Sequence, residues 1–260
     1  MTPPPSQDVL TRAAAMPDAV LRYADHEDGV VELHLPARAL PRPLVVLVHG
    51  GFWKQEYDRR HIRPMARALV DAGCVVAAPE YRRVGGRGGW PATGDDLAAA
   101  LTSLPGLLTG LGVATTTTTV VGHSAGGHLA LWLAGLDELD HRCDRVVALA
   151  PVADLRAAAR ERLGDGATQA LLGGSPEEVP EAYADADPMR LLDTTPRTAG
   201  LVILHGSRDD VVPLSQSRAL ADRHPHVELR VLDADHFDVI DPTSQVWPQV
   251  LVAITGQGDG

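Results

Sequence analysis

The chain has 260 residues, of which 45% are hydrophobic and 22% charged, and its formal net charge is −11. This size and composition fit a single globular domain, residues 1–260, with one large core. A negative balance of this size disfavours nucleic acids and anionic membrane surfaces as partners, because both bind basic surfaces. The start of the sequence lacks a signal-peptide pattern and no apolar run approaches membrane-spanning length, so we expect a cytoplasmic protein with no membrane partner.

Short, continuous apolar runs alternate with amphipathic segments of helical length. The predicted strands cover residues 29–35, 44–50, 74–80, 118–124, 145–151, 200–206 and 227–233. The predicted helices cover residues 58–72, 93–104, 126–136, 215–223 and 244–254. Continuous apolar runs are typical of strands buried on both faces, and we expect the first of them at a sheet edge. The alternation predicts an α/β fold in which a mostly parallel sheet carries helices on both faces.

Residues 153–196 interrupt this alternation. The segment is rich in Ala, Asp, Glu, Arg and Pro and has no strand signal. We expect a small, cap-like helical insertion over the functional site; a surface excursion without catalytic bearing is the alternative.

Two cysteines, Cys74 and Cys143, are far apart in sequence and lack zinc-ligand spacing. Cys74 opens an apolar run and is expected to be a reduced, buried side chain. The sequence also lacks a phosphate-binding loop and a dinucleotide fingerprint. We therefore expect neither a cofactor nor a metal ion.

The segment "VVGHSAGGHLALWLAG" is the most informative part of the chain. An apolar strand runs into Gly122-His123-Ser124-Ala125-Gly126 and directly on into an apolar helix, which is the context of a G-x-S-x-G nucleophile elbow in an α/β-hydrolase fold. A serine on so sharp a turn has a strained backbone, and flanking side chains would collide with it, so glycines flank Ser124. The alternative is an ordinary glycine-rich turn.

A second motif, "HGGFW" at residues 49–53, directly follows the apolar run "LVVLV" of the strand predicted at residues 44–50. In this fold an oxyanion hole takes one N–H from the residue after the nucleophile and others from this loop. Gly51, Phe52 and Ala125 are therefore the predicted oxyanion donors. We expect His49 to brace the loop by hydrogen bonding rather than act as a base.

The order of the residues selects the histidine and the acid, because both follow the serine in α/β-hydrolases. Of the histidines after Ser124, only His236 follows the last strand. The acid is expected after the strand at 200–206, where Asp209 is favoured to orient His236 and Asp210 to cap a turn or face solvent.

Several aromatic and cationic side chains fall in or beside these loops. Trp53, Tyr81, Trp90 and Phe237 are candidate substrate-binding residues, with packing beneath the loops as the alternative for each. A cluster of arginines, Arg82, Arg83 and Arg87, is a candidate partner for a substrate carboxylate.

Together, HGGFW, GHSAGG, "HGSRDDVVP" and "HFDVIDP" resemble bacterial α/β-hydrolases of the kynurenine formamidase (arylformamidase) group, which neighbours the hormone-sensitive-lipase-like esterases. The resemblance spans nearly the whole chain. It implies a triad of Ser124, Asp209 and His236 and hydrolysis of aryl formamides or simple esters. One loop departs from the family pattern, because "PEYRR" continues as "VGGRGGWP".

We therefore expect a serine hydrolase that cleaves an aryl formamide or a short-acyl ester through an acyl-enzyme. The partner is expected to be a small-molecule ester or amide, bound by a monomer or a homodimer. A general carboxylesterase is the alternative within the same chemistry, and a non-catalytic ligand receptor is the alternative outside it.

Overall fold

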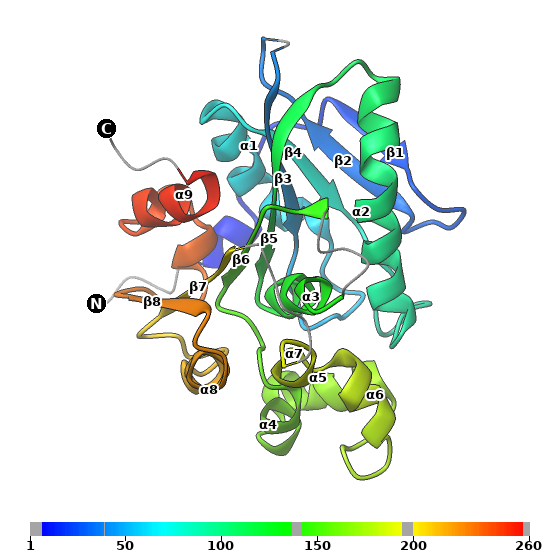
Figure 1. The fold of residues 1–260 in the computed structure, drawn as a ribbon, viewed down its shortest axis with the longest axis vertical. Helices are drawn as coiled ribbons and strands as arrows, with labels where there is room; N and C mark the ends of the chain where they lie inside the picture. Colours follow the sequence, from blue (N-terminus) through cyan, green and yellow to red (C-terminus); the bar gives the residue numbers. More distant parts are fainter. Residues whose placement is uncertain (1–6, 39, 137–141, 194–199, 257–260) are drawn as a thin grey trace.

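The computed structural model describes residues 7–38, 40–136, 142–193 and 200–256, and its centre is one eight-stranded sheet (Figure 1). The strands lie in the order β1-β2-β4-β3-β5-β6-β7-β8. Their bounds are β1 (Ala19–Arg22), β2 (Val30–His34), β3 (Arg42–Val48), β4 (Val75–Pro79), β5 (Thr115–His123), β6 (Arg145–Leu149), β7 (Gly200–Gly206) and β8 (Val227–Leu232).

The sheet is parallel from β4 to β8, and only β1 and β2 run antiparallel to their neighbours. The mostly parallel sheet with helices on both faces is as predicted. The expectation that residues 29–35 form an edge strand is wrong, because β1 pairs with the outer side of β2. A strand of four residues whose side chains alternate between partly buried and exposed is too short for a hydrophobic pattern to reveal.

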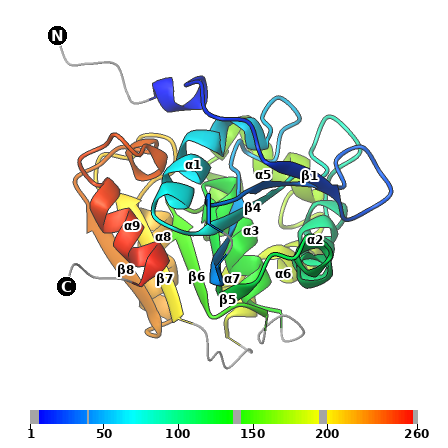
Figure 2. The same cartoon turned by 90° about the horizontal axis from the view of Figure 1, so that it is seen from above.

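The helices cover the two faces of the sheet (Figures 1 and 2). They are α1 (Arg63–Asp71), α2 (Ala92–Gly110), α3 (Ala125–Ala134), α4 (Leu155–Arg160), α5 (Leu163–Leu172), α6 (Pro180–Ala186), α7 (Pro188–Leu191), α8 (Ser215–Arg223) and α9 (Trp247–Thr255), with the 3-10 turns η1 (Gln7–Leu10), η2 (Arg59–Ile62) and η4 (Asp238–Ile240). Helices α1 and α9 pack on one face, and α2, α3 and α8 pack on the other. The second predicted helix continues past Pro105, because the buried Leu108 anchors its last turn.

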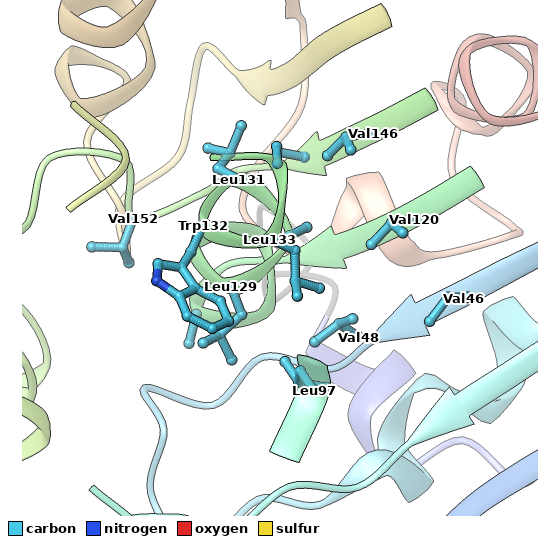
Figure 3. Close-up of a cluster of buried hydrophobic side chains, with 14 of the residues drawn as sticks. Val46, Val48, Leu97, Val120, Leu129, Leu131, Trp132, Leu133, Val146 and Val152 are labelled. Carbon is cyan, nitrogen blue, oxygen red and sulfur yellow. The ribbon is translucent and has the colours of Figure 1, made fainter. Parts of the chain in front are cut away.

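Successive residues of the central strands contribute to two separate cores. In β3, Val46 and Val48 belong to the core shared with α2 and α3, whereas Val45 and Leu47 belong to the core shared with α1 and α9. This alternation explains why the central strands are continuously apolar in sequence. Figure 3 shows the first core, with the side chains of α3 packed against β3, β5 and β6.

Helix α3 is apolar around its whole circumference because protein covers it on every side. One face packs on the sheet, and the other packs against α2 and α7. Helices α4 to α7 form the excursion between β6 and β7 that was predicted for residues 153–196, of which 194–196 lie outside the described residues. Within the described ranges, no helix is long and apolar enough to cross a membrane.

Candidate active site

Ser124 lies on the sharp turn between β5 and α3, as the sequence predicted. Its backbone has φ 56° and ψ −117°, a conformation that costs free energy for any residue with a Cβ atom. The turn is held on both sides, because the Ser124 N–H donates to the carbonyl of Leu149 at 2.8 Å and the Ser124 carbonyl accepts from His128 N–H at 3.0 Å. Bonds on both sides keep the serine at the carboxyl edge of the sheet, where ligands bind in this class of fold.

Glycines allow the backbone segments around Ser124 to approach one another. A Cβ atom at Gly122 would lie 2.0 Å from the carbonyl oxygen of Gly126, and one at Gly126 would lie 2.3 Å from that of Val48. A Cβ atom at Gly50 would lie 3.1 Å from the Cβ of Ser124. The motif therefore requires glycine for close packing between strand ends as well as for the turn itself.

The HGGFW loop turns sharply through three consecutive residues with positive φ: Gly51 at 105°, Phe52 at 49° and Trp53 at 56°. Within the described part of the chain, the N–H groups of Gly51, Phe52 and Ala125 donate to no protein acceptor. Ala125 is the first residue of α3, so its free N–H is one of the unpaired donors that every helix start presents. These three predicted oxyanion donors thus lie near Ser124, and their N–H groups are available to a substrate oxygen.

A buried hydrogen bond between His49 and Glu80 supports this loop. The His49 Nε2 atom lies 2.7 Å from Glu80 Oε1, and the ring of Tyr81 stacks on the His49 ring at 4.3 Å. The Tyr81 hydroxyl donates to the carbonyl of His49 at 2.9 Å. Burial raises the pKa of Glu80. The charge and hydrogen bond of His49 and the charge of Arg83 together outweigh burial and lower this pKa to about 2. His49 is therefore a bracing residue, as expected.

The loop after β8 holds His236 through reciprocal turns. The Asp235 carboxylate accepts from the N–H groups of Phe237 and Asp238, and the Asp238 carboxylate accepts from the N–H of Asp235 at 2.8 Å. The loops after β7 and β8 are also joined, because Arg208 N–H donates to the carbonyl of Ala234 at 3.0 Å. This join places the loop with the candidate acids beside His236.

Asp209 contacts the histidine, and Asp210 does not. The His236 Nδ1–H group donates to Asp209 Oδ2 at 2.7 Å, while Asp209 Oδ1 accepts from the N–H groups of Val211 and Val212. The Asp209 side chain is fully buried, whereas Asp210 is exposed. Burial raises the pKa of Asp209, but hydrogen bonds from His205 and His236 bring it well below its usual value. Asp209 is thus a carboxylate that can fix one tautomer of His236.

Two further histidines take part, and the sequence analysis gave them no such role. His123 donates from Nε2 to the carbonyl of His236 at 2.9 Å, which ties the elbow to the histidine loop. His205 lies 3.3 Å from Asp209 Oδ2 and donates from Nε2 to the carbonyl of Val212. His123 lies one residue before Ser124, and His205 lies four residues before Asp209. These positions are the only signals in the sequence that point to the two histidines.

A cavity of about 240 Å³ contains Ser124 and His236. It is lined by Gln7, Leu10, Gly51, Phe52, Tyr57, His61, His123, Ser124, Val211, His236 and Phe237. Burial lowers the pKa of His61 to about 4, and burial holds the pKa of His123 well below its usual value. Both rings are therefore neutral at pH 7, and the cavity is lined mainly by apolar and uncharged groups.

Three of the predicted substrate-binding residues do not line this cavity, and those assignments are wrong. Trp53 and Tyr81 are almost fully buried beneath the loops, where Trp53 packs edge-on against His128 at 5.2 Å. Trp90 donates from Nε1 to Asp185 at 2.7 Å and packs against Trp132, which places it between α3 and the insertion. Each of the three fills space between backbone segments instead of facing the cavity.

Phe237 and Phe52 do line the cavity. The ring of Phe52 also lies against the insertion, because a Cβ atom at Gly164 would be 2.6 Å from it. The insertion therefore contributes to the site by holding a cavity wall.

The arginine cluster does not face the cavity either. Arg82 forms a bidentate pair with Asp96, and Arg83 is buried against Asp28 and the carbonyl of Tyr57. No arginine or lysine is among the described residues that line the cavity. Among the residues that the structure describes, no group of three or more His, Cys, Asp or Glu side chains is arranged to hold a metal ion.

Comparison with known families now adds to this geometry. A model of the BD-FAE family, a family of hydrolase-fold esterases, matches residues 31–223. The chain belongs to the BD-FAE family. The matched range includes the HGGFW loop, the elbow and Asp209, whereas His236 and the first 30 residues lie outside it.

Two curated proteins from Mycobacterium tuberculosis (strain ATCC 25618 / H37Rv) are similar to this BD-FAE chain. Esterase LipC is 28% identical over 225 residues, which make up 77% of this chain and 54% of LipC. The probable carboxylic ester hydrolase LipM is 26% identical over 197 residues, 70% of this chain and 44% of LipM. The chain thus spans about half the length of the curated relatives it matches.

Solved structures show the same architecture. Esterase B from Lactobacillus rhamnosis (HN001) has a TM-score of 0.76 and 20% identity, with 96% of this chain and 91% of that chain covered. Esterase 2 from Thermogutta terrifontis, solved with propionate bound, has a TM-score of 0.68 and 21% identity, with 90% of both chains covered. At such identities the similarity establishes the α/β-hydrolase fold alone, and the arylformamidase grouping stays a prediction.

The Glu80–His49 pair predicts an acid-sensitive contribution to stability. The Glu80 pKa is lowered from 4.5 to about 2 on folding, so its carboxylate stabilises the native state above pH 4.5, and this contribution is lost as the pH falls from 4.5 towards 2. Glu80→Gln should lower the free energy of unfolding by about 3 kcal/mol at pH 7 and by progressively less below pH 4.5. Urea unfolding across this pH range measures the difference.

Glu161→Gln is the matched control, because Glu161 is exposed and should change stability little at any pH. A Glu80→Gln deficit that is constant from pH 7 to pH 3 would show that ionisation of the Glu80 carboxylate does not produce it.

Proposed function

We propose that the chain is a serine hydrolase that cleaves short-acyl esters of uncharged substrates through an acyl-enzyme. The observation that carries the proposal is the placement of Ser124, strained and beside unpaired N–H groups, in one cavity with a histidine that is hydrogen-bonded to a buried carboxylate. The names of LipC and LipM, an esterase and a probable carboxylic ester hydrolase, support the ester chemistry.

In this mechanism the Ser124 hydroxyl attacks the ester carbonyl and His236 accepts its proton through Nε2. The Asp209 carboxylate keeps the proton on Nδ1 of His236 and stabilises the imidazolium that forms. The N–H groups of Phe52 and Ala125, with Gly51, stabilise the oxyanion, and the positive end of α3 adds to this. His236 then protonates the leaving alcohol, and water releases the acyl group by the reverse steps.

The lining of the cavity indicates the substrate class. Its volume of about 240 Å³ and the Phe52 ring, which the insertion holds in place, favour a short acyl group. The absence of arginine and lysine among the described lining residues disfavours substrates that carry a carboxylate. N-formylkynurenine has a short formyl group, but it also carries a carboxylate, and the described lining residues include no arginine or lysine to pair with it. We therefore rank neutral short-acyl esters above aryl formamides.

The nucleophile is tested by Ser124→Ala. We expect purified protein to hydrolyse 4-nitrophenyl acetate and the variant to lose turnover by about a millionfold, because the triad acts as a unit. Labelling by a fluorophosphonate probe should disappear with it, while the thermal unfolding midpoint stays close to the wild-type value, because alanine keeps the Cβ atom and leaves the backbone of the turn and the core packing unchanged. Activity above a few per cent of wild type would exclude Ser124 as nucleophile.

The neighbouring acids provide a matched pair. Asp209→Asn should lower kcat by about ten-thousandfold, because an amide donor favours the wrong tautomer of His236. Asp210→Asn should change kcat less than twofold, because Asp210 is exposed and makes no contact with His236. Equal losses in both variants would point to damage of the loop instead of loss of the orienting carboxylate.

A substrate panel tests the class. The ratio kcat/KM should fall steeply from 4-nitrophenyl acetate to 4-nitrophenyl octanoate, by about tenfold for each added methylene that the cavity cannot hold. The 4-nitrophenyl monoester of glutarate and N-formylkynurenine should both be poorer substrates than 4-nitrophenyl butanoate. A rate that rises with acyl length, or a preference for the two carboxylates, would contradict the proposed substrate class.

A further inference from the structure

Residues 7–12, here called the N-terminal strap, lie against the catalytic cavity although they are far from it in sequence. Gln7 and Leu10 line the same cavity as Ser124 and His236. The turn η1 of this strap contacts η2, which leads into α1, and Figure 2 shows it (dark blue) beside α1. The family match begins at residue 31, so the strap belongs to the part of this chain that the family does not define.

The strap is fixed at two points. Between the two cavity-lining residues, Val9 is 1% exposed and packs in the core that contains Ile62 and Met65. Two residues after Leu10, the Arg12 guanidinium pairs with both carboxylate oxygens of Asp241, with Nη2 2.8 Å from Oδ2. One buried anchor and one bidentate ion pair hold Leu10 between them.

The Arg12–Asp241 pair attaches the strap to the loop that carries His236. Asp241 follows η4 directly and is 4% exposed, and its Oδ1 also accepts from the N–H and hydroxyl of Thr243 at 2.8 Å. The strap is therefore linked directly to the histidine loop, and this charge pair, together with the buried Val9, fixes its position relative to His236.

The chemistry of the proposed reaction indicates which part of the substrate lies beside the N-terminal strap. The imidazolium of His236 must reach the leaving-group oxygen to protonate it, so the alcohol lies on the histidine side of Ser124 and the oxyanion donors lie on the other. Phe237 and Leu10, which border the cavity and belong to segments joined to this loop, are on the alcohol side.

We propose that the N-terminal strap is the outer wall of the alcohol pocket and that the Leu10 side chain limits the size of the alcohol this esterase accepts. The inference rests on the proposed function for the identity of the leaving group. It assigns no role in catalysis to the strap: Leu10 determines specificity, and Arg12 is a positioning residue that acts through it.

Acetate esters of ethanol, butanol and hexanol provide the test, because these primary alcohols have nearly equal basicity and differ mainly in length. Leu10→Ala should raise the kcat/KM of hexyl acetate relative to ethyl acetate by about tenfold, and Leu10→Phe should lower the same ratio. The ratio for 4-nitrophenyl hexanoate over 4-nitrophenyl acetate, which reports on the acyl side, should stay within twofold in both variants.

Arg12→Ala should shift the alcohol ratio in the same direction as Leu10→Ala by releasing the strap. Its matched control is Arg67→Ala, which removes another arginine–aspartate pair, Arg67 with Asp71 on the exposed side of α1, and should leave the ratio unchanged. An alcohol ratio that stays within twofold of wild type in both Leu10 variants would overturn the proposal. A change in the ratio of 4-nitrophenyl hexanoate to 4-nitrophenyl acetate without a change in the alcohol ratio would also overturn the proposal.

Binding of the free alcohols separates this inference from the proposed function. In the Ser124→Ala background, Leu10→Ala should strengthen binding of 1-hexanol relative to ethanol, measured by saturation-transfer NMR. If no ester is hydrolysed but this shift is seen, the proposed reaction fails and the wall stands. If esters are hydrolysed and neither ratio moves, the wall fails and the reaction stands.

Discussion

Three backbone segments meet around Ser124 at distances that no Cβ atom tolerates, and the rest of the site depends on this approach. The end of β3 lies against the elbow at Gly126, and the two arms of the elbow lie against each other at Gly122. The strain at Ser124 is balanced by backbone hydrogen bonds to β6 and within α3 and by burial of α3 on the sheet. Because these constraints come from a packed core, the serine has one position relative to the ends of β3 and β6.

The other components of the site are attached to this fixed point by long-range bonds. His123, one residue before the nucleophile, donates to the backbone of His236, so the elbow itself positions the histidine loop. The carboxylate of Asp209 is fixed by two backbone N–H groups before it accepts from His236. Three loops far apart in sequence are thereby joined by hydrogen bonds, and both cysteines, Cys74 and Cys143, are free.

The sequence predicted the parts of this arrangement that depend on local patterns. Continuous apolar runs predicted the central strands. The glycines around Ser124 predicted the sharp turn, and the order of Asp209 and His236 after it predicted the acid and the histidine at the same sheet edge. The roles of Trp53 and Tyr81 could not be predicted, because three successive positive φ angles in the HGGFW loop and the stacking on His49 decide which way these rings point. Neither feature has a periodic signal.

The charge distribution of the site follows from the same packing. In the resting state the buried carboxylate of Asp209 lies behind His236, on the side of the ring away from the cavity, and no arginine or lysine is among the described residues that line the cavity. In the proposed transition state, an oxyanion and an imidazolium form together beside that carboxylate, so the net charge of the site does not change. The Asp209 carboxylate stabilises the imidazolium, and oriented dipoles, the free N–H groups of Phe52 and Ala125 and the start of α3, stabilise the oxyanion. Such dipoles stabilise an anion only where they are fixed in advance, which is the physical reason for the buried support of His49 and Glu80 under the loop.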